Sequence, residues 1–190
     1  MIFAGYVVAA LAFLSTAILA AWIYAHPEQH NRFTHDAPVM IMYILGAWLF
    51  LPLGWIWSVA FIIIVLLCNL WFVMRVCPHC AYHGRLDGPS VYCVMSIHLS
   101  GRREPQHFAH HFRQNVGISV VSWVLPVIGG VIALRLLHDL TYGLVLLAAF
   151  GVIAFLLVPM AARPNCERCL NREACPYGGN AAIDKKQKVP

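Results

Sequence analysis

Residues 59–76, VAFIIIVLLCNLWFVMRV, form a long apolar stretch that passes directly into CPHCAYHG at residues 77–84. A helix needs about 20 mostly apolar residues to cross the hydrocarbon core of a bilayer. The whole chain has the matching composition, with 61% hydrophobic and 11% charged residues, whereas about a quarter of the residues in a soluble domain are charged. The sequence therefore predicts an integral membrane protein with a Cys/His-rich segment at the mouth of one helix.

Five apolar stretches predict five transmembrane helices in a single membrane domain over residues 1–190. Pro52 and Gly54 divide the second apolar block by a tight turn, and HDLTYG at 138–143 divides the third. The first stretch has no basic segment before it and is longer than the core of a signal peptide, so we expect it to be a retained helix. The fold class is thus an all-α polytopic bundle, with helices at about 2–25, 38–52, 55–76, 115–137 and 143–162.

Basic residues predict the orientation of the bundle, because loops rich in Lys and Arg stay in the cytoplasm. With five spans, the segment 26–37, the loop 77–113 and the tail 163–190 share one side. Of the 13 basic residues, Arg135 alone lies on the other side. We therefore expect a multi-pass protein of the cytoplasmic membrane, with an external N-terminus and a cytoplasmic Cys/His-rich cap. Orientation and anionic head groups account for the charge of +5, so the bilayer is an expected partner and nucleic acid is not.

Six of the seven cysteines form two clusters of similar shape. Each begins with a Cys-x2-Cys turn where a predicted helix leaves the membrane, and each has a third cysteine further along the chain. The seventh, Cys68, lies inside an apolar stretch and is expected to act as a small hydrophobic residue. The candidate metal ligands are Cys77, Cys80 and Cys93 in the first cluster, and Cys166, Cys169 and Cys175 in the second.

Two arrangements of these thiols remain open. Two Cys-x2-Cys turns brought together give a tetrahedral four-thiolate site, which would join the loop to the tail. Alternatively, each cluster forms its own site from three thiolates and one imidazole, which in the first cluster comes from His79, His83 or His98. Neither arrangement follows from spacing alone.

The identity of the metal is also open. Zn²⁺ is the expected cofactor, because cytoplasmic thiols stay reduced and zinc favours such sites. Iron is the alternative, as a mononuclear rubredoxin-like site, a di-iron site or an iron–sulfur cluster. Disulfide chemistry beside a quinone, as in proteins similar to vitamin K epoxide reductase, needs thiols on the oxidising side, and the basic residues place these thiols inside.

The pattern CPHCAYHG…YC, followed by a helical hairpin and CERCLNREACP, resembles a family of small polytopic bacterial and archaeal membrane proteins. The resemblance covers about residues 70–180 and carries over only the six clustered cysteines. It implies that the two clusters are paired and implies no particular activity. The histidine-rich loop is a departure from the family pattern.

Histidines are the second unusual feature, with ten in the chain. HPEQH at 26–30 and HFAHHF at 107–112 resemble the histidine boxes of membrane di-iron desaturases and hydroxylases, since imidazoles three or four residues apart share one helix face. The chain lacks the second HxxHH box of those enzymes. Histidines solvated at the membrane interface explain the same pattern. The lower-ranked metal candidates are His26, His30, His107, His110 and His111.

Polar residues within the apolar stretches are few, and no ladder of acidic residues indicates a transport path. Asn69 and Asn115 are expected to form hydrogen bonds between helices, and Gly129 and Gly130 should allow close helix packing beside Pro126. Three functions follow from the cap. The metal site is structural and presents a surface to a membrane complex or cytoplasmic protein, or the protein is an iron-dependent membrane oxidoreductase, or it handles or senses metal.

Overall fold

The computed structural model describes residues 2–26, 32–83, 90–99, 108–136, 140–171 and 175. Helices dominate this part of the chain, as the composition predicts, and a π-helical turn at Ile153–Leu157 joins the sixth helix to the seventh without a break. The helices are α1 (Ile2–Ala25), α2 (Arg32–Phe50), α3 (Trp55–Arg75), α4 (Val91–Leu99), α5 (Phe108–Leu134), α6 (Leu140–Val152) and α7 (Val158–Arg168).

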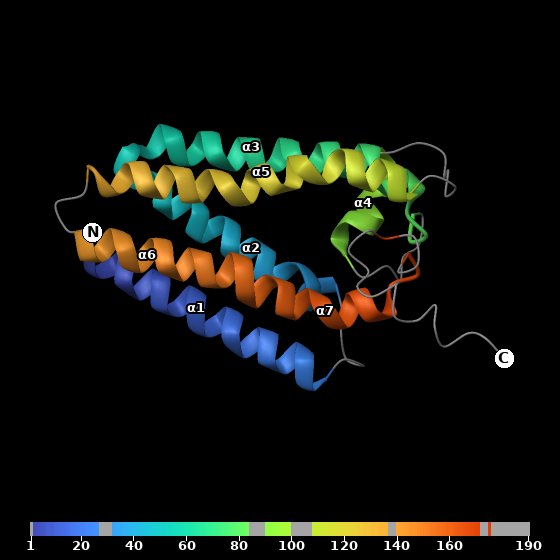
Figure 1. The fold of residues 1–190 in the computed structure, drawn as a ribbon, viewed down its shortest axis with the longest axis horizontal. Helices are drawn as coiled ribbons and strands as arrows, with labels where there is room; N and C mark the ends of the chain where they lie inside the picture. The colour runs from blue at the N-terminus through green and yellow to red at the C-terminus, as the bar shows by residue number, and fades with distance from the viewer. Residues whose placement is uncertain are drawn as a thin grey trace.

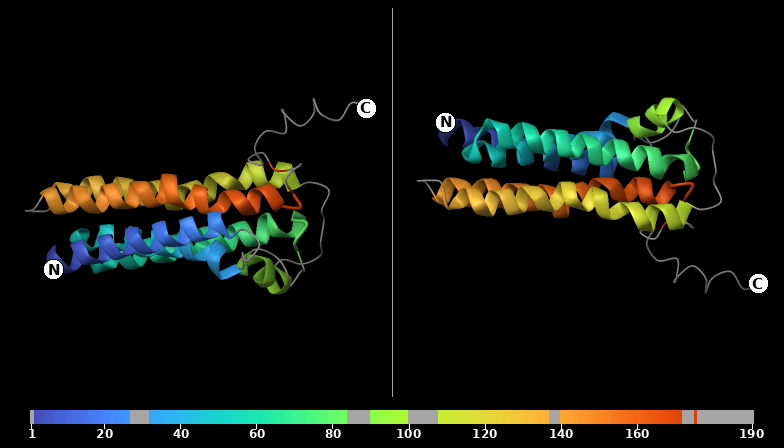
Figure 2. Two further views of the ribbon diagram at one scale, coloured as in Figure 1. Left: turned by 90° about the horizontal axis from the view of Figure 1, so that it is seen from below. Right: turned by 90° about the horizontal axis from the view of Figure 1, so that it is seen from above.

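The long helices form two layers (Figure 2). The first three, α1, α2 and α3, make one layer, and α5 with the continuous α6–α7 helix makes the other. The end of α3, the short helix α4, the start of α5 and the end of α7 all lie at one end of the bundle, which we call the cap end (Figure 1). The two cysteine clusters therefore leave the bundle at the same end.

In the described part of the chain, four helical segments are long and apolar enough to cross a membrane: Asp36–Leu53, Trp55–His79, Phe108–Leu134 and Leu140–Arg163. Helix α1 contributes a shorter apolar stretch, Ala10–Ile23. The outer face of α3 carries large exposed apolar side chains, including Ile56 and Leu66, each 63% exposed. Soluble monomers rarely show such extended apolar faces. The architecture is that of a membrane protein.

The turn between α2 and α3 confirms the expected division of the second apolar block. A short 3-10 turn, Leu51–Leu53, follows α2 directly and contains Pro52. Gly54 then adopts φ 115°, a backbone conformation that side chains with a Cβ rarely enter. Its N–H donates to the Leu51 carbonyl at 2.9 Å, which closes the hairpin.

Helix α2 lies at the centre of the packing and contacts every other long helix. Its residues Met42, Leu45 and Leu49 meet Leu146 and Phe150 of α6 in the main buried cluster. Because lipid is as apolar as the helix surfaces, close van der Waals contact rather than hydrophobic burial holds such helices together.

Small residues and a few polar side chains provide this contact. The Phe50 ring lies directly against Gly129 of α5, as expected from the glycine pair. Asn115 accepts a hydrogen bond from Trp71 Nε1 at 2.9 Å, which joins α5 to α3 and confirms its expected role. Trp48 Nε1 donates to the Tyr142 hydroxyl at 3.0 Å, which joins α2 to α6.

The helix bounds differ from the expected ones at the cap end. Helix α2 begins at Arg32 rather than 38 and keeps Pro38 inside it. Helix α5 begins at Phe108 rather than 115, and the last helix runs from 140 to 168 rather than from 143 to 162. The loop expected over 77–113 contains a helix of its own, α4. Hydropathy marks only the apolar part of a helix, so polar turns that continue it outside the membrane are missed.

Candidate functional site

The first cysteine turn forms where α3 ends. A 3-10 turn, Cys77–His79, contains Pro78 and bends the chain back over the helix end. The Cys80 N–H donates to the Cys77 carbonyl at 3.0 Å, and the His83 N–H donates to the Cys80 carbonyl at 3.0 Å. Two consecutive tight turns thus hold the CPHC segment against the bundle.

The Cys80 sulfur receives hydrogen bonds from two N–H donors. The backbone N–H of Tyr82 lies 3.4 Å from Sγ, and the side-chain Nδ2 of Asn171 lies 3.0 Å from it. Hydrogen bonds to sulfur favour the thiolate, and they are one of the means by which proteins tune thiolate-bound metals. The surroundings of Cys80 therefore fit a metal-ligating thiolate.

The C-terminal turn after α7 meets this first turn directly. Asn171 is 8% exposed, and its Oδ1 accepts a hydrogen bond from the Ala81 N–H at 3.0 Å. The Leu170 N–H donates to the Tyr82 hydroxyl at 3.2 Å. One amide side chain thus bridges segments 90 residues apart, and the beginning of the first cluster lies beside the second. Neither Asn171 nor Tyr82 carries a sequence signal that would have singled it out.

Cys93 completes the first cluster from the first turn of α4. Cys93 is 9% exposed, its N–H donates to the Ser90 carbonyl at 3.1 Å, and its own carbonyl accepts from the buried Ser96 hydroxyl at 2.8 Å. Burial, followed by the nearby thiols of Cys80 and Cys93, raises the pKa of the Cys77 thiol to about 12. Cys77 therefore lies on the same side of the cap as the other two cysteines of the first cluster.

Tyr82 lies where the two clusters meet. Burial raises the pKa of Tyr82, the hydrogen bond from the Leu170 N–H lowers it, and the nearby thiols of Cys169, Cys80 and Cys93 raise it further. Thiols from both clusters thus act electrostatically on one phenol.

The remaining cysteines are less informative. Cys68 lies in α3 and is a half-buried free thiol away from the clusters. Cys175 is also a half-buried free thiol, whereas the Cys166 side chain lies outside the described part of the structure. Among the described side chains, no three His, Cys, Asp or Glu groups lie close enough together to hold one metal ion.

A stacked pair of histidines joins the cysteine turn to α5. His79 is 8% exposed and stacks on His111, with ring centroids 3.7 Å apart and planes 3° from parallel. His110 meets His111 edge-on at 5.5 Å. Imidazole lone pairs lie in the ring plane, so two parallel stacked rings do not direct their lone pairs at one ion. This pair braces the cap in the described arrangement.

The other described candidate histidines lie on three different segments. His83 Nδ1 is 3.1 Å from the Ser96 hydroxyl, and His98 at the end of α4 is exposed. His26 stacks on Trp22 at the end of α1 and lies 3.2 Å from the Trp22 carbonyl. His30 and His107 lie outside the described residues, so the two predicted histidine boxes are only partly visible.

Comparison of the chain with protein-family models, with curated proteins and with solved structures finds no match.

Proposed function

We propose that this membrane protein carries a structural metal site that ties the segment after α3 to the segment after α7, with zinc as the metal. The observation that supports this most directly is the bridge made by Asn171, which binds both the Cys80 sulfur and the Ala81 N–H. A metal held by thiolates from both segments would reinforce a junction that hydrogen bonds already form.

The favoured ligands are Cys77, Cys80, Cys93 and Cys169. Cys80 and Cys93 each influence Cys77, and Cys169 influences the same phenol as Cys80 and Cys93. Four thiolates satisfy the tetrahedral preference of Zn²⁺, with Zn–S distances of about 2.3 Å. Metal binding would require these sulfurs to lie closer together than they do in the described arrangement.

A structural role fits this donor set better than a reactive one. Catalytic zinc keeps one coordination position open for water or substrate, whereas four thiolates close the site. Cys93 is buried, and Cys80 already accepts two N–H donors. The cap would then be a rigid surface for a membrane complex or soluble partner. The distribution of basic residues favours the cytoplasmic side for this surface.

The test compares metal content and thermal stability in purified protein. The Cys80→Ser/Cys169→Ser variant should lose the metal and unfold at a lower temperature, whereas the Cys68→Ser control should keep both. We expect about one zinc per chain in the wild type, and addition of a strong zinc chelator should lower its unfolding temperature. A double variant with wild-type metal content and stability would contradict the proposal.

Iron is tested by the same preparation. A colourless, zinc-loaded protein supports the structural site. Visible absorption that changes with dithionite would instead support the iron-dependent oxidoreductase, and weak, exchangeable metal of either kind would support metal handling.

A further inference from the structure

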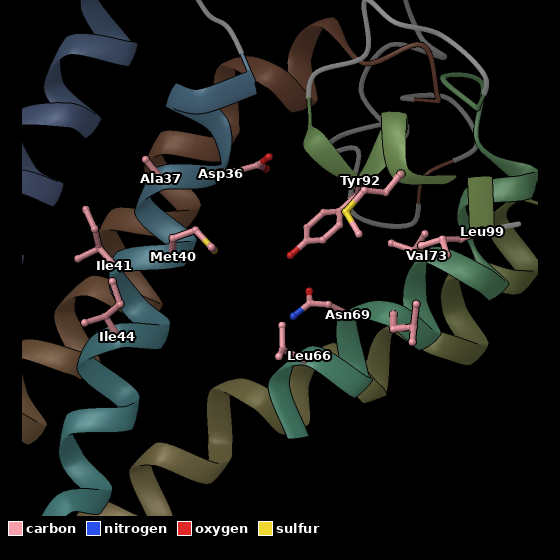
Figure 3. Close-up of a pocket in the computed structure, with 12 residues that line it drawn as sticks. Asp36, Ala37, Met40, Ile41, Ile44, Leu66, Asn69, Val73, Tyr92 and Leu99 are labelled. Atoms are coloured by element: carbon pink, nitrogen blue, oxygen red, sulfur yellow. The ribbon is translucent and has the colours of Figure 1, made fainter. Parts of the chain in front are cut away.

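A cavity of about 790 Å³ lies between α2, α3 and α4, just below the cap (Figure 3). Its walls are mostly apolar, with Ile41 and Ile44 from α2, Leu66 and Leu70 from α3, and Met95 from α4. The volume falls within the range of about 300–1,000 Å³ that is typical of small-molecule sites. None of the clustered cysteines is among the described residues that line it.

Three polar side chains interrupt the apolar wall near the cap. Asp36, Asn69 and Tyr92 come from three different helices, and their polar groups point into the same space (Figure 3). The Ser90 hydroxyl lies 2.9 and 3.2 Å from the two carboxylate oxygens of Asp36, which fixes that side chain.

Two polar atoms in this space are left without protein partners. Asn69 uses its Nδ2 to donate to the Val65 carbonyl at 2.8 Å and, more weakly, to the Tyr43 hydroxyl at 3.5 Å. Within the described residues, neither the Asn69 Oδ1 nor the Tyr92 hydroxyl forms a hydrogen bond. Asn69 and Tyr92 are each half-buried. Because an unpaired polar atom in an apolar setting is unfavourable, a ligand that supplies the missing partners would be favoured here.

The available groups define the head of that ligand. Asn69 Oδ1 and the Asp36 carboxylate are acceptors, so the ligand must donate a hydrogen bond, and the Tyr92 hydroxyl can donate one in return. Among the described residues that line the cavity there is no Lys or Arg. A phosphate diester offers only acceptor oxygens, which cannot pair with the Asn69 Oδ1. A neutral hydroxyl group satisfies all three residues.

The apolar part of the cavity defines the rest of the ligand. Ile44 and Leu66, at the end remote from the cap, are each 63% exposed on the outer surface of the bundle. Along α2, Ile44 lies eight residues beyond Asp36, or about 12 Å at the helical rise per residue. This is room for a hydrocarbon chain that leaves the cavity sideways into the bilayer.

We propose that the cavity binds a neutral membrane lipid with a hydroxyl head, which lies among Asp36, Asn69 and Tyr92 while its chain runs between α2 and α3. A quinol, an isoprenoid alcohol and a diacylglycerol share this chemistry, and the binding experiment separates them. The proposal does not depend on the metal site.

The test uses the full-length protein in detergent and measures binding of four probes by native mass spectrometry. These are short-chain ubiquinol, farnesol, dioleoylglycerol and, as the anionic comparison, dioleoylphosphatidylglycerol. We expect at least one neutral probe to bind more tightly than the anionic lipid, and the preferred one identifies the source. Equal binding of all four probes, or no binding of the neutral ones, would overturn the proposal.

Two variants locate the site. Tyr92→Phe removes one hydroxyl that has no hydrogen-bond partner among the described residues. It should lower the affinity for the preferred probe about two- to tenfold without lowering the stability of the protein. Leu66→Trp, on the exposed wall, should obstruct the chain. The Tyr142→Phe control removes a packing hydrogen bond outside the cavity, so it should lower stability and still bind the probe as the wild type does. Unchanged binding in both cavity variants would also overturn the proposal.

Discussion

Replacing Gly129 by alanine tests the packing that brings the two layers of the bundle together. A Cβ at Gly129 would overlap the Phe50 ring, whose Cε1, Cζ and Cδ1 atoms all fall within or at 3.0 Å of the added atom. Phe50 has little room to withdraw, because it stacks against Phe61 with ring centroids 5.1 Å apart. The methyl group must therefore push α5 away from α2.

The magnitude follows from two opposing effects. Overpacking a dense core costs about 1–3 kcal/mol, and the overlap with a braced ring places Gly129→Ala near the upper end. Alanine recovers about 1 kcal/mol of helix propensity, so the net loss should be about 2 kcal/mol. Gly117 lies on the same helix with nothing within 4 Å of its added Cβ, so Gly117→Ala should gain the propensity term alone, about 1 kcal/mol.

The assay is reversible unfolding of both variants in mixed micelles with increasing SDS, followed by tryptophan fluorescence and circular dichroism. The expected difference between the two alanine variants is about 3 kcal/mol, the sum of the loss at one site and the gain at the other. If Gly129→Ala were as stable as Gly117→Ala, Phe50 would not lie against α5 and the arrangement of α2 on α5 would be wrong.

Three further predictions concern single polar groups. Tyr142→Phe removes the acceptor of the Trp48 N–H, 3.0 Å away, and should cost about 0.6–1.7 kcal/mol in the same unfolding assay. Ser58→Ala removes a buried hydrogen bond of 2.8 Å to the Ala47 carbonyl and should lower the unfolding free energy by a similar amount. The same substitution at an exposed serine should lower it less. Burial, followed by the charges of Tyr43, Asp36 and Cys77, raises the pKa of Tyr92 to about 12. The unfolded chain, with an ordinary tyrosine pKa of about 10, then loses its proton first, so stability should fall between pH 10 and 12, and Tyr92→Phe should flatten that fall.

The hairpin between α2 and α3 could be predicted from the sequence because its signal is local. Pro52 and Gly54 interrupt an apolar block too long for one span, and the structure uses them where they stand. The same is true of the close contact at Gly129, where absence of a side chain is itself the signal. A structural feature that depends on one residue type at one position can be predicted from the sequence alone.

The start of α5 could not be predicted in this way, because its signal is amphipathic rather than apolar. Phe108 and Phe112 lie one turn apart with ring centroids at 5.4 Å, and Phe112 meets Phe72 of α3 edge-on at 5.8 Å. The intervening histidines and Arg113 lower the mean hydropathy of this turn. Packing against α3 makes it helical, and only the fold reveals that packing.

The junction at Asn171 could not be predicted from the sequence either, for a different reason. The sequence allows the clusters to meet, because both follow predicted helices that end on one side. The residue that joins them is an ordinary polar side chain whose partners, Cys80 and Ala81, lie about 90 residues earlier. Its importance comes from tertiary position, which a single sequence does not encode by residue type.

Helix α4 is the element on which both proposals depend. At nine residues, it is shorter than the 12–15 or so that an isolated helix needs to be even marginally stable in water, so packing on its two faces must maintain it. Tyr92, Met95 and Leu99, spaced three and four residues apart, line the cavity, whereas Cys93 and Ser96 are buried on another face towards the cysteine turn. Tyr92 and Cys93 are adjacent, so a lipid bound at the phenol and a metal bound at the thiol would both restrict the same short helix. If both proposals hold, binding of either ligand should then change the affinity for the other by the same factor.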